Sequence, residues 1–406
     1  MELKRRPPIV ELPSYGLTSD LLSFIRCGLQ YRYMRIGKLP PTRPLQLWFG
    51  QFIHGVLEEG FRQYDFARRQ GEHDLPPWPA ERIREILEQI KQRLAAQGLF
   101  AWDAALERAG DARARTILNE LGPILFPLIH RAEVRLTGAR HLRTDLIPPE
   151  LRVRAVERYE IAGVIDVISH VQLDNPEHQT NQLVDLVLAN LPAPPDGDFE
   201  VIVDYKGMRR PPHLVNDGAP QSFDVFDWQI LTYADLRSRH QDAHPVAAGV
   251  IIYLNELQPG TDDLLRLKEE LAKDRTDVRP QAGSEVAYQL QRWHQGDPLP
   301  HLPLEFRLRR AVRVVPVTPA AIPEALTRFD EVVASIETCR GREIISGAVI
   351  NSWDQNASDQ ATCAACDHRT YCPDYLATWS SKARAAPTLP AETPKRDAGL
   401  RVGSGT

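Results

Sequence analysis

Apolar residues recur at intervals of three and four along the first third of the chain, which is the spacing of one face of a helix. Four stretches fit this pattern, with helix-start residues before several of them and glycine or proline after them. The expected helices are 18–38, 46–70, 81–97 and 112–136. The sequence therefore predicts a helical region before the first strand.

The period then changes to two, which indicates half-buried strands. Residues 151–158 and 161–171 alternate in this way, so we expect a hairpin with its turn around Glu160. Residues 172–198 are polar and rich in proline, and are interpreted as an insertion with a short helix at 181–190.

The remaining core elements alternate between the two periods. We expect a strand at 199–206, a helix at 224–239, a strand at 246–254, helical structure over 261–294, a strand at 305–317 and a helix at 319–346. A hairpin followed by strand, helix and strand is typical of an α/β fold with a mixed central sheet flanked by helices.

Five consecutive regions follow from these patterns. They are N-terminal helices at 1–75, a helical segment at 76–150, an α/β core at 151–350, a cysteine-bearing segment at 351–378 and a disordered tail at 379–406. The tail is expected to be disordered because it lacks apolar periodicity.

Composition excludes some classes of protein. The 406 residues carry a net charge of −5, which argues against a protein that coats nucleic acid by bulk attraction. The sequence has no apolar run long enough for a membrane span and no secretory signal, so we expect a cytoplasmic protein without membrane contact. Its cysteines should then be reduced thiols or metal ligands.

Carboxylates and a lysine lie at the ends of two expected strands. In the segment Asp204-Tyr-Lys206, the side chains at i and i+2 leave the same face of a strand. With Asp166 on a neighbouring strand, two carboxylates can hold Mg²⁺ or Mn²⁺ while Lys206 orients a water molecule. These are the parts that phosphodiester hydrolysis requires.

Each piece alone also has a simpler interpretation. An Asp-x-Lys tripeptide is usually a solvated strand end, and a single histidine on a helix, such as His54, is usually a core residue. Glu157 and Glu160 could add an acid to the pocket, although a solvated hairpin turn is the interpretation we prefer.

The order of the short motifs separates these alternatives. Gly50-x3-His54, Gly163-x2-Asp166, Asp204-x-Lys206 and Gln229-x3-Tyr233 follow one another along the chain. This series resembles that of RecB-like nucleases of the PD-(D/E)XK superfamily, although many relatives have glutamate at the position of Asp204. The long spacer between Asp166 and Asp204 indicates an inserted element beside the site.

The resemblance implies a role for each motif residue. His54, Asp166, Asp204 and the Tyr205 carbonyl would bind the divalent metal, and Lys206 would be the catalytic lysine. Gln229 and Tyr233, which share one helix face, would contact DNA or fix Lys206.

A second cluster, Cys363-x2-Cys366-x5-Cys372, is the most specific local pattern of the chain. Three cysteines within ten residues indicate metal ligation. The fourth ligand could be Cys27, Cys339 or His368, and the spacing alone favours zinc.

The resemblance points to iron instead. A single cysteine in the first helix, the nuclease core and then this cluster are similar to the arrangement in CRISPR-associated and AddB-type iron–sulfur nucleases. That similarity implies a [4Fe–4S] cluster bound by Cys27, Cys363, Cys366 and Cys372, with Cys339 as a buried apolar residue.

Basic residues offer further candidates for substrate contacts. Arg26, Arg32, Arg35 and Lys38 alternate with Tyr31 and Tyr33, which suits either a single-strand contact or a solvated helix face with buried tyrosines. Arg209 and Arg210 follow Lys206 directly, and we expect one of them to touch the substrate.

Three functions are compatible with these features. The first is an exonuclease acting on DNA ends, above all single-stranded ones, in repair, recombination, phage defence or CRISPR adaptation. The second is an endonuclease subunit of a defence or repair complex. The third is a non-catalytic DNA-binding scaffold, against which the intact motif set argues. The sequence has no P-loop motif, so unwinding would require a helicase or another partner protein.

Overall fold

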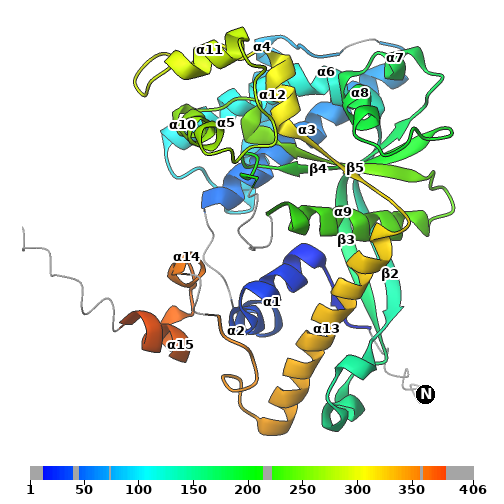
Figure 1. Cartoon of the computed structure of the whole chain (residues 1–406), viewed down its shortest axis with the longest axis vertical. Helices are drawn as coiled ribbons and strands as arrows, with labels where there is room; N and C mark the ends of the chain where they lie inside the picture. Colours follow the sequence, from blue (N-terminus) through cyan, green and yellow to red (C-terminus); the bar gives the residue numbers. More distant parts are fainter. Residues whose placement is uncertain (1–11, 40–44, 73–74, 214–221, 357–359, 381–406) are drawn as a thin grey trace, which may run out of the picture.

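The computed structural model describes residues 12–39, 45–72, 75–213, 222–356 and 360–380. Within these residues the chain forms one mixed sheet flanked by helices, as predicted (Figure 1). The strands are β1 (Ser14–Tyr15), β2 (Ile129–His141), β3 (Arg158–Val171), β4 (Phe199–Lys206), β5 (Val246–Tyr253) and β6 (Val312–Pro316).

Strand β3 organises the sheet. Strand β2 pairs with it antiparallel, while β1 and β4 share its other edge at different points. Beyond β4 lie β5, which is parallel to β4, and β6, which is antiparallel to β5.

Helices surround this sheet. They are α1 (Leu22–Arg26), α2 (Gly28–Tyr31), α3 (Leu45–Arg69), α4 (Ala80–Ala96), α5 (Ala104–Thr116), α6 (Gly122–Leu125), α7 (Pro176–Gln179), α8 (Gln182–Ala189), α9 (Ser222–Ser238), α10 (Thr261–Ala272), α11 (Glu285–Arg292), α12 (Leu304–Ala311), α13 (Ala321–Ser346), α14 (Gln360–Ala364) and α15 (Pro373–Tyr375). Short helical turns precede α1 at Leu17–Leu21 and follow α2 at Arg32–Ile36. Over the described part of the chain, no helix is both long and apolar enough to span a membrane.

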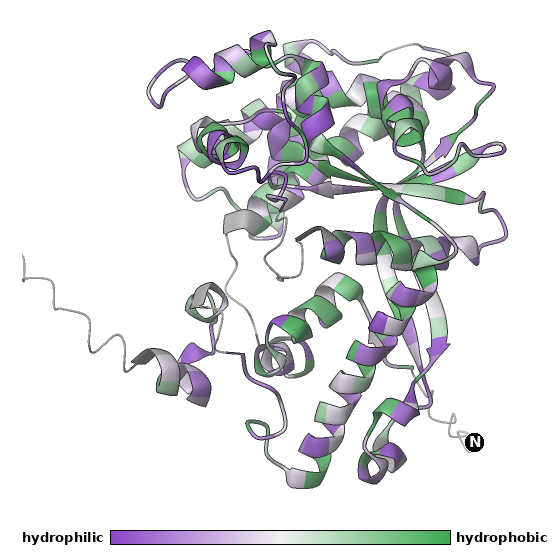
Figure 2. Ribbon diagram, viewed as in Figure 1, coloured by the Kyte–Doolittle hydropathy of each residue, from purple (hydrophilic) through white to green (hydrophobic). Residues whose placement is uncertain are grey.

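The two faces of the sheet bury separate apolar clusters. One face packs against α3 to α6 and α8, and the other against α1, α2, α9 and α13. Successive residues of β4 alternate between the clusters, with Val201 and Val203 on one side and Ile202 on the other. Burial on both faces explains why the centre of this strand, Val201-Ile202-Val203, is apolar without alternation, and Figure 2 shows the hydrophobic strands at the centre of the molecule.

The two ends of the described chain pack together. The buried Trp353 lies with its ring centroid 6.2 Å from Phe24 and 6.0 Å from Tyr31. The Leu29 amide donates to the Asp354 carbonyl, and the Asn356 side-chain amide donates to the Arg26 carbonyl. As a result, α14 and α15 lie beside the first helices (Figure 1).

Most predicted elements are confirmed. The expected helices at 46–70, 81–97, 224–239 and 319–346 correspond to α3, α4, α9 and α13, and the expected strands at 199–206 and 246–254 to β4 and β5. Helical structure over 18–38 is present but interrupted at Cys27, whose backbone is extended. Between 261 and 294 the helical structure divides into α10 and α11.

The predicted hairpin is wrong. Residues 129–141 form β2, so the helix expected over 112–136 ends by Leu128, just after Pro127, and the segment 76–150 is not entirely helical. The true hairpin is β2–β3, and a boundary at 150/151 would cut through the sheet.

Two further strand predictions need correction. Residues 149–154 form a 3₁₀ turn rather than a strand, and Leu151 packs close to Gly341 of α13. Glu160 lies within β3, paired with Ala139, rather than at a turn. The strand expected over 305–317 is helical as far as Ala311, and β6 starts at Val312.

The expected insertion at 172–198 contains α7 and α8. Residues Leu183, Val184 and Val187 of α8 are buried against the helices of the first cluster. The Asn181 side chain also donates to the Ile124 carbonyl at 2.6 Å. The segment is therefore part of the helical layer. The expected disordered tail lies, from residue 381 onwards, outside the described residues.

Candidate active site

The site lies at a gap in the edge of β3. On this edge β1 pairs with Glu160 and Ile161, and β4 pairs only from Val167 onwards. A cavity of about 510 Å³ opens at the stretch between them. Its lining residues are Thr18, Ser19, His54, Arg135, Ala162, Gly163, Val164, Asp166, Asp204, Tyr205, Lys206, Gln229 and Tyr233.

A second cavity continues from the first between α3 and α4. It measures about 790 Å³ and shares His54, Val164 and Asp166 with the first cavity. Gly50 lines it, and a β-carbon at that position would meet no atom of the described residues within 4 Å. Asp166 therefore lies where the two cavities meet, and an elongated molecule could occupy both cavities and pass it.

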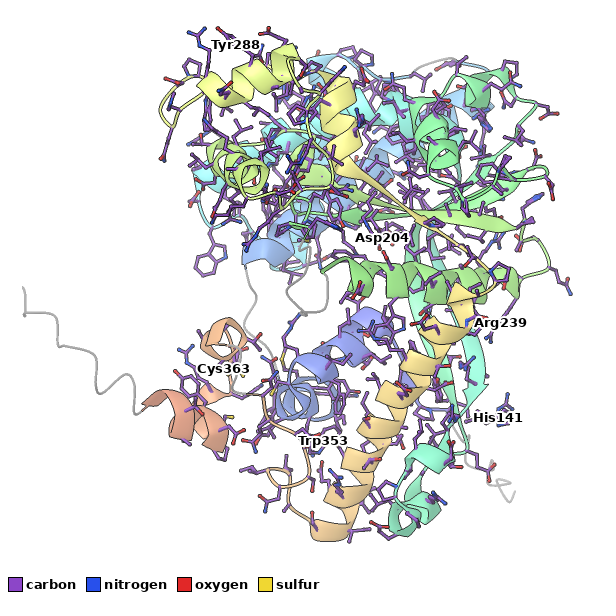
Figure 3. All side chains as sticks on the ribbon, in the orientation of Figure 1. His141, Asp204, Arg239, Tyr288, Trp353 and Cys363 are labelled. Atoms are coloured by element: carbon purple, nitrogen blue, oxygen red, sulfur yellow. The ribbon has the colours of Figure 1, made fainter. Side chains whose placement is uncertain are left out.

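Lys206 is held between two partners. Its Nζ lies 2.5 Å from Asp204 Oδ2 and donates to Gln229 Oε1 at 3.0 Å. The Gln229 amide in turn donates to Asp204 Oδ1 at 2.8 Å. Figure 3 shows Asp204 between the sheet and α9, the helix that carries Gln229. The end of β4 and one helix face therefore fix the ammonium group.

Asp166 faces the same end of β4. Its Oδ2 accepts a hydrogen bond from the Tyr205 amide at 2.8 Å, at the point where β3 and β4 separate. Burial, with the charge of Asp204 nearby, raises the pKa of Asp166 to about 7. Such a shift in a cleft is typical of a functional acid.

His54 reaches the site from α3. Its Nδ1 lies 3.6 Å from Asp166 Oδ1. A ring N–H of His54 donates a hydrogen bond to the backbone carbonyl of Tyr205. Burial lowers the pKa of His54. The neutral imidazole, which is the form that binds metals, is therefore favoured.

Glu133 is a site residue that the sequence reasoning missed. Its carboxylate lies with the ligand atoms of His54 and Asp166 in a group within 4.8 Å of one another. Glu133 follows Ala132, which pairs with Val167, and precedes Val134, which pairs with Ile165. It thus lies opposite Asp166. Its φ of 52° is unusual for a residue with a side chain, and such strain is common at functional sites.

Glu157 lies exposed in the connection before β3, as the interpretation as a solvated hairpin turn expects. For Glu160 that interpretation is wrong, since this residue lies on β3 and accepts a hydrogen bond from Ser14. Neither residue lines the two cavities. The additional acid of the site is Glu133, which lies in the segment 112–136 that was wrongly predicted as a helix. The alternation of residues 131–136 after Pro127 was the signal that could have found it.

Tyr233 closes one wall of the site. Burial beside Asp204 raises its pKa to about 12, and its hydroxyl bonds with Gln229 and Thr18. A β-carbon on Gly163 would lie only 2.3 Å from the Tyr233 ring. The glycine of the Gly163-x2-Asp166 motif is therefore needed for α9 to approach β3.

The expected substrate contact by Arg209 or Arg210 is not supported. Arg209 is paired with Glu270, and Arg210 is 4% exposed and bonded to Asp277 at 2.8 Å. Both side chains tie the loop after β4 to the segment around α10. They lie outside the lining of the two cavities.

The basic N-terminal residues are partly engaged as well. Arg32 binds Glu343 at 2.6 Å, and Arg35 binds Asp20 at 3.2 Å. Tyr31 is buried, and Tyr33 packs its ring against His368. The interpretation as a helix face with buried tyrosines therefore describes this region better than a strand-stacking surface.

The four expected cluster cysteines gather at one end of the molecule, and Figure 3 shows Cys363 on α14. Burial raises the pKa of the Cys366 thiol, and the nearby Cys27 and Cys372 raise it further. None of the five cysteines forms a disulfide. Cys339 is buried within α13, as expected. No three of the sulfurs lie within 4.8 Å of one another, so the thiols converge without forming a closed site.

The acid site fits a divalent cation. Asp204 Oδ2 is buried and accepts no hydrogen bond of suitable angle from the described residues, although Lys206 lies beside it. Carboxylate oxygens with one imidazole are a donor set that suits Mg²⁺ and Mn²⁺. The residues predicted as ligands, His54, Asp166, Asp204 and Tyr205, all line the cavity. The ligand atoms that lie within 4.8 Å of one another are those of His54, Asp166 and Glu133, without Asp204.

Comparison with known proteins supports the same conclusion. A search of curated proteins finds no match. The model of the PD-(D/E)XK nuclease superfamily matches residues 18–373, which include every element around the cavities. The chain therefore belongs to the PD-(D/E)XK nuclease superfamily, and this membership implies a metal-dependent nuclease.

Proposed function

We propose that this protein is a Mg²⁺- or Mn²⁺-dependent exonuclease that degrades DNA from single-stranded ends. The observation that carries the proposal is the meeting of Asp166, Asp204, Lys206 and Gln229 around one cavity. His54, Asp166, Asp204 and the Tyr205 carbonyl would hold the cation, with Glu133 within reach. The cation would supply Lewis acidity at the phosphoryl group.

Lys206 is suited to act on the attacking water. An ammonium group has three donors, and two of them face Asp204 and Gln229. The third can orient a water molecule or stabilise the charge that develops on a phosphoryl oxygen. Gln229 acts as a positioning residue because it contacts Lys206 and Asp204 rather than the reacting atoms. Tyr233 acts through its hydrogen bond with Gln229.

Arg135 supports a nucleic acid as the substrate. It is exposed, lines the smaller cavity, and pairs through its backbone with Val164, two residues from Asp166. A guanidinium at this place suits a phosphate of the strand being cleaved.

The experiment compares end-labelled linear single-stranded DNA with circular single-stranded DNA in the presence of Mn²⁺. The proposal predicts that linear DNA is shortened from an end and that circles survive. Cleavage of circles would contradict the exonuclease proposal and indicate an endonuclease. If neither substrate were cleaved, a non-catalytic scaffold would be favoured. An RNA strand of the same sequence tests the preference for DNA.

We also propose that Cys27, Cys363, Cys366 and Cys372 bind a [4Fe–4S] cluster. The thiol donor set, the influence of Cys27 and Cys372 on Cys366, and the packing of both chain ends support this assignment. Each cysteine would bind one iron and join the first helices to α14 and α15. Iron and sulfide analysis of protein purified without oxygen tests it, and a colourless protein with stoichiometric zinc would contradict it.

A further inference from the structure

Three histidines and an aspartate meet at the other end of the sheet, away from the carboxylate site. His130 lies at the start of β2, His170 near the end of β3, and Asp198 and His244 just before β4 and β5. The ring centroids of His170 and His244 are 4.1 Å apart, and those of His130 and His170 are 6.0 Å apart. Four separate segments thus bring metal-binding side chains to one place.

Local backbone features aim two of these side chains. The register of β2 against β3 shifts between Ile129 and Arg131, which leaves His130 as the bulged residue. Bulges redirect side chains in this way next to functional sites. Asp198 is oriented too, because its Oδ1 accepts a hydrogen bond from the Leu173 amide at 3.2 Å.

His170 and Asp198 form the fixed half of the cluster. The His170 Nε2 is buried, has no hydrogen-bond partner among the described residues, and lies 3.8 Å from Asp198 Oδ2. This distance is too long for a hydrogen bond. Two ligands of a tetrahedral zinc ion lie about 3.4 Å apart, since each is about 2.1 Å from the metal. The pair therefore leaves nearly the space that a zinc ion requires.

We infer that His130, His170, His244 and Asp198 form a second metal site, which takes Zn²⁺ or a similar transition-metal ion. The ligand atoms do not yet form a group within 4.8 Å, so the exposed rings of His130 and His244 turn inward on binding. Three imidazole nitrogens and one carboxylate oxygen then complete a tetrahedral shell.

The charges around the cluster are compatible with this ion. Burial and the neighbouring His244 lower the pKa of His170, which favours the neutral imidazole that binds metals. Below the cluster, the buried Glu200 is fully paired with Arg237 at 2.7 Å and does not compete for the ion. The bound ion would cross-link the ends of β2, β3, β4 and β5, so its role is structural and independent of the nuclease proposal.

Zinc uptake by the full-length protein tests this inference. Equilibrium dialysis against Zn²⁺ is compared for the wild type, His170→Gln, His244→Gln and the control His141→Gln. His141 is exposed at the other end of β2 (Figure 3). The acid site and the cysteine site are intact in all four proteins. Zinc bound at these two sites is therefore the same in each protein and does not affect the difference between them.

The inference predicts that His170→Gln and His244→Gln each bind one zinc ion fewer than the wild type, whereas His141→Gln binds the same amount. Zinc should also raise the thermal midpoint of the wild type more than that of the two variants. Any other pattern of uptake overturns the site. Circular dichroism checks the fold of each variant, and Asp198→Asn replaces His170→Gln if the latter does not fold.

Discussion

The carboxyl group of Asp166 links acidity to metal binding. Its pKa of about 7 reflects burial near the charge of Asp204. Because the folded pKa lies above the ordinary value of 3.8, the contribution of this carboxyl group to the stability of the fold is fully present only below pH 3.8. The contribution is lost as the pH rises through 7.

The same shift predicts a pH dependence of metal affinity. A cation must displace a proton from Asp166 below pH 7, so the affinity for Mn²⁺ should fall by about tenfold per pH unit there and level off above it. Isothermal titration calorimetry across this range measures the effect, with Asp166→Asn as the variant that lacks the titrating group. An affinity that stays constant below pH 7 would contradict the assignment.

Glu133 should contribute to the same metal site. We expect Glu133→Gln to weaken Mn²⁺ binding by roughly tenfold or more, since changes next to a metal typically cost 10–100-fold. Glu58→Gln is the matched control, because Glu58 lines the larger cavity but forms an ion pair with Arg93. The Mn²⁺ dependence of cleavage provides the measurement. If both substitutions changed the Mn²⁺ dependence equally, Glu133 would not be a residue of the metal site.

At the scale of elements, the contact between β3 and α9 sets the position of Lys206. A methyl group at position 163 would lie 2.3 Å from the buried Tyr233 ring, closer than real contacts allow. Gly163→Ala should therefore displace α9 and Gln229, lowering kcat and destabilising the protein by about 1–3 kcal/mol.

Gly197→Ala serves as the control for this substitution, because a β-carbon there would meet no atom within 4 Å in the part of the chain that the structure describes. Single-turnover kinetics and thermal denaturation of both variants provide the test. If Gly163→Ala keeps the wild-type rate, the approach of α9 to β3 does not determine the position of Lys206.

The sequence predicts elements well where local periodicity and burial agree. The apolar stripe of 46–70 and the doubly buried run of 199–206 correspond closely to α3 and β4. The carboxylate and lysine motifs could also be placed, because Asp204 and Lys206 share one strand face. Their meeting with Asp166 required only that two strands be neighbours, as β3 and β4 are.

Other elements depend on tertiary contacts that no local pattern reveals. Residues 151–158 alternate like a strand, yet Leu151 packs close to α13, and residues 149–154 form a 3₁₀ turn directly after Pro148. Arg209 and Arg210 follow Lys206 in sequence, but their side chains pair with Glu270 and Asp277 on distant segments and do not line the cavity. The position of Glu133 depends on a positive φ that its sequence does not predict.

At the scale of the whole molecule, the stability of the packing between the first helices and α14 and α15 should depend on the proposed cysteine cluster. We expect Cys363→Ala to lose iron and to lower the free energy of unfolding by roughly 2–5 kcal/mol, as for loss of a native cross-link. The chemical step should change much less, because Cys363 is not part of the acid site. Cys339→Ala, the control, should keep its iron since Cys339 is a buried packing residue of α13. Iron content and denaturant unfolding measure both effects.

Wild-type stability in Cys363→Ala would contradict a structural role of the cysteine cluster.

We propose that nucleic acid is cleaved in the cavity lined by Asp166, Asp204 and Lys206. The most direct test is the rate of Mn²⁺-dependent cleavage of labelled single-stranded DNA by the wild type, Lys206→Ala and the control Lys273→Ala, whose lysine is exposed on the surface. The account predicts that Lys206→Ala loses roughly 100-fold or more of the rate, whereas Lys273→Ala retains it. Wild-type cleavage by Lys206→Ala would contradict the account.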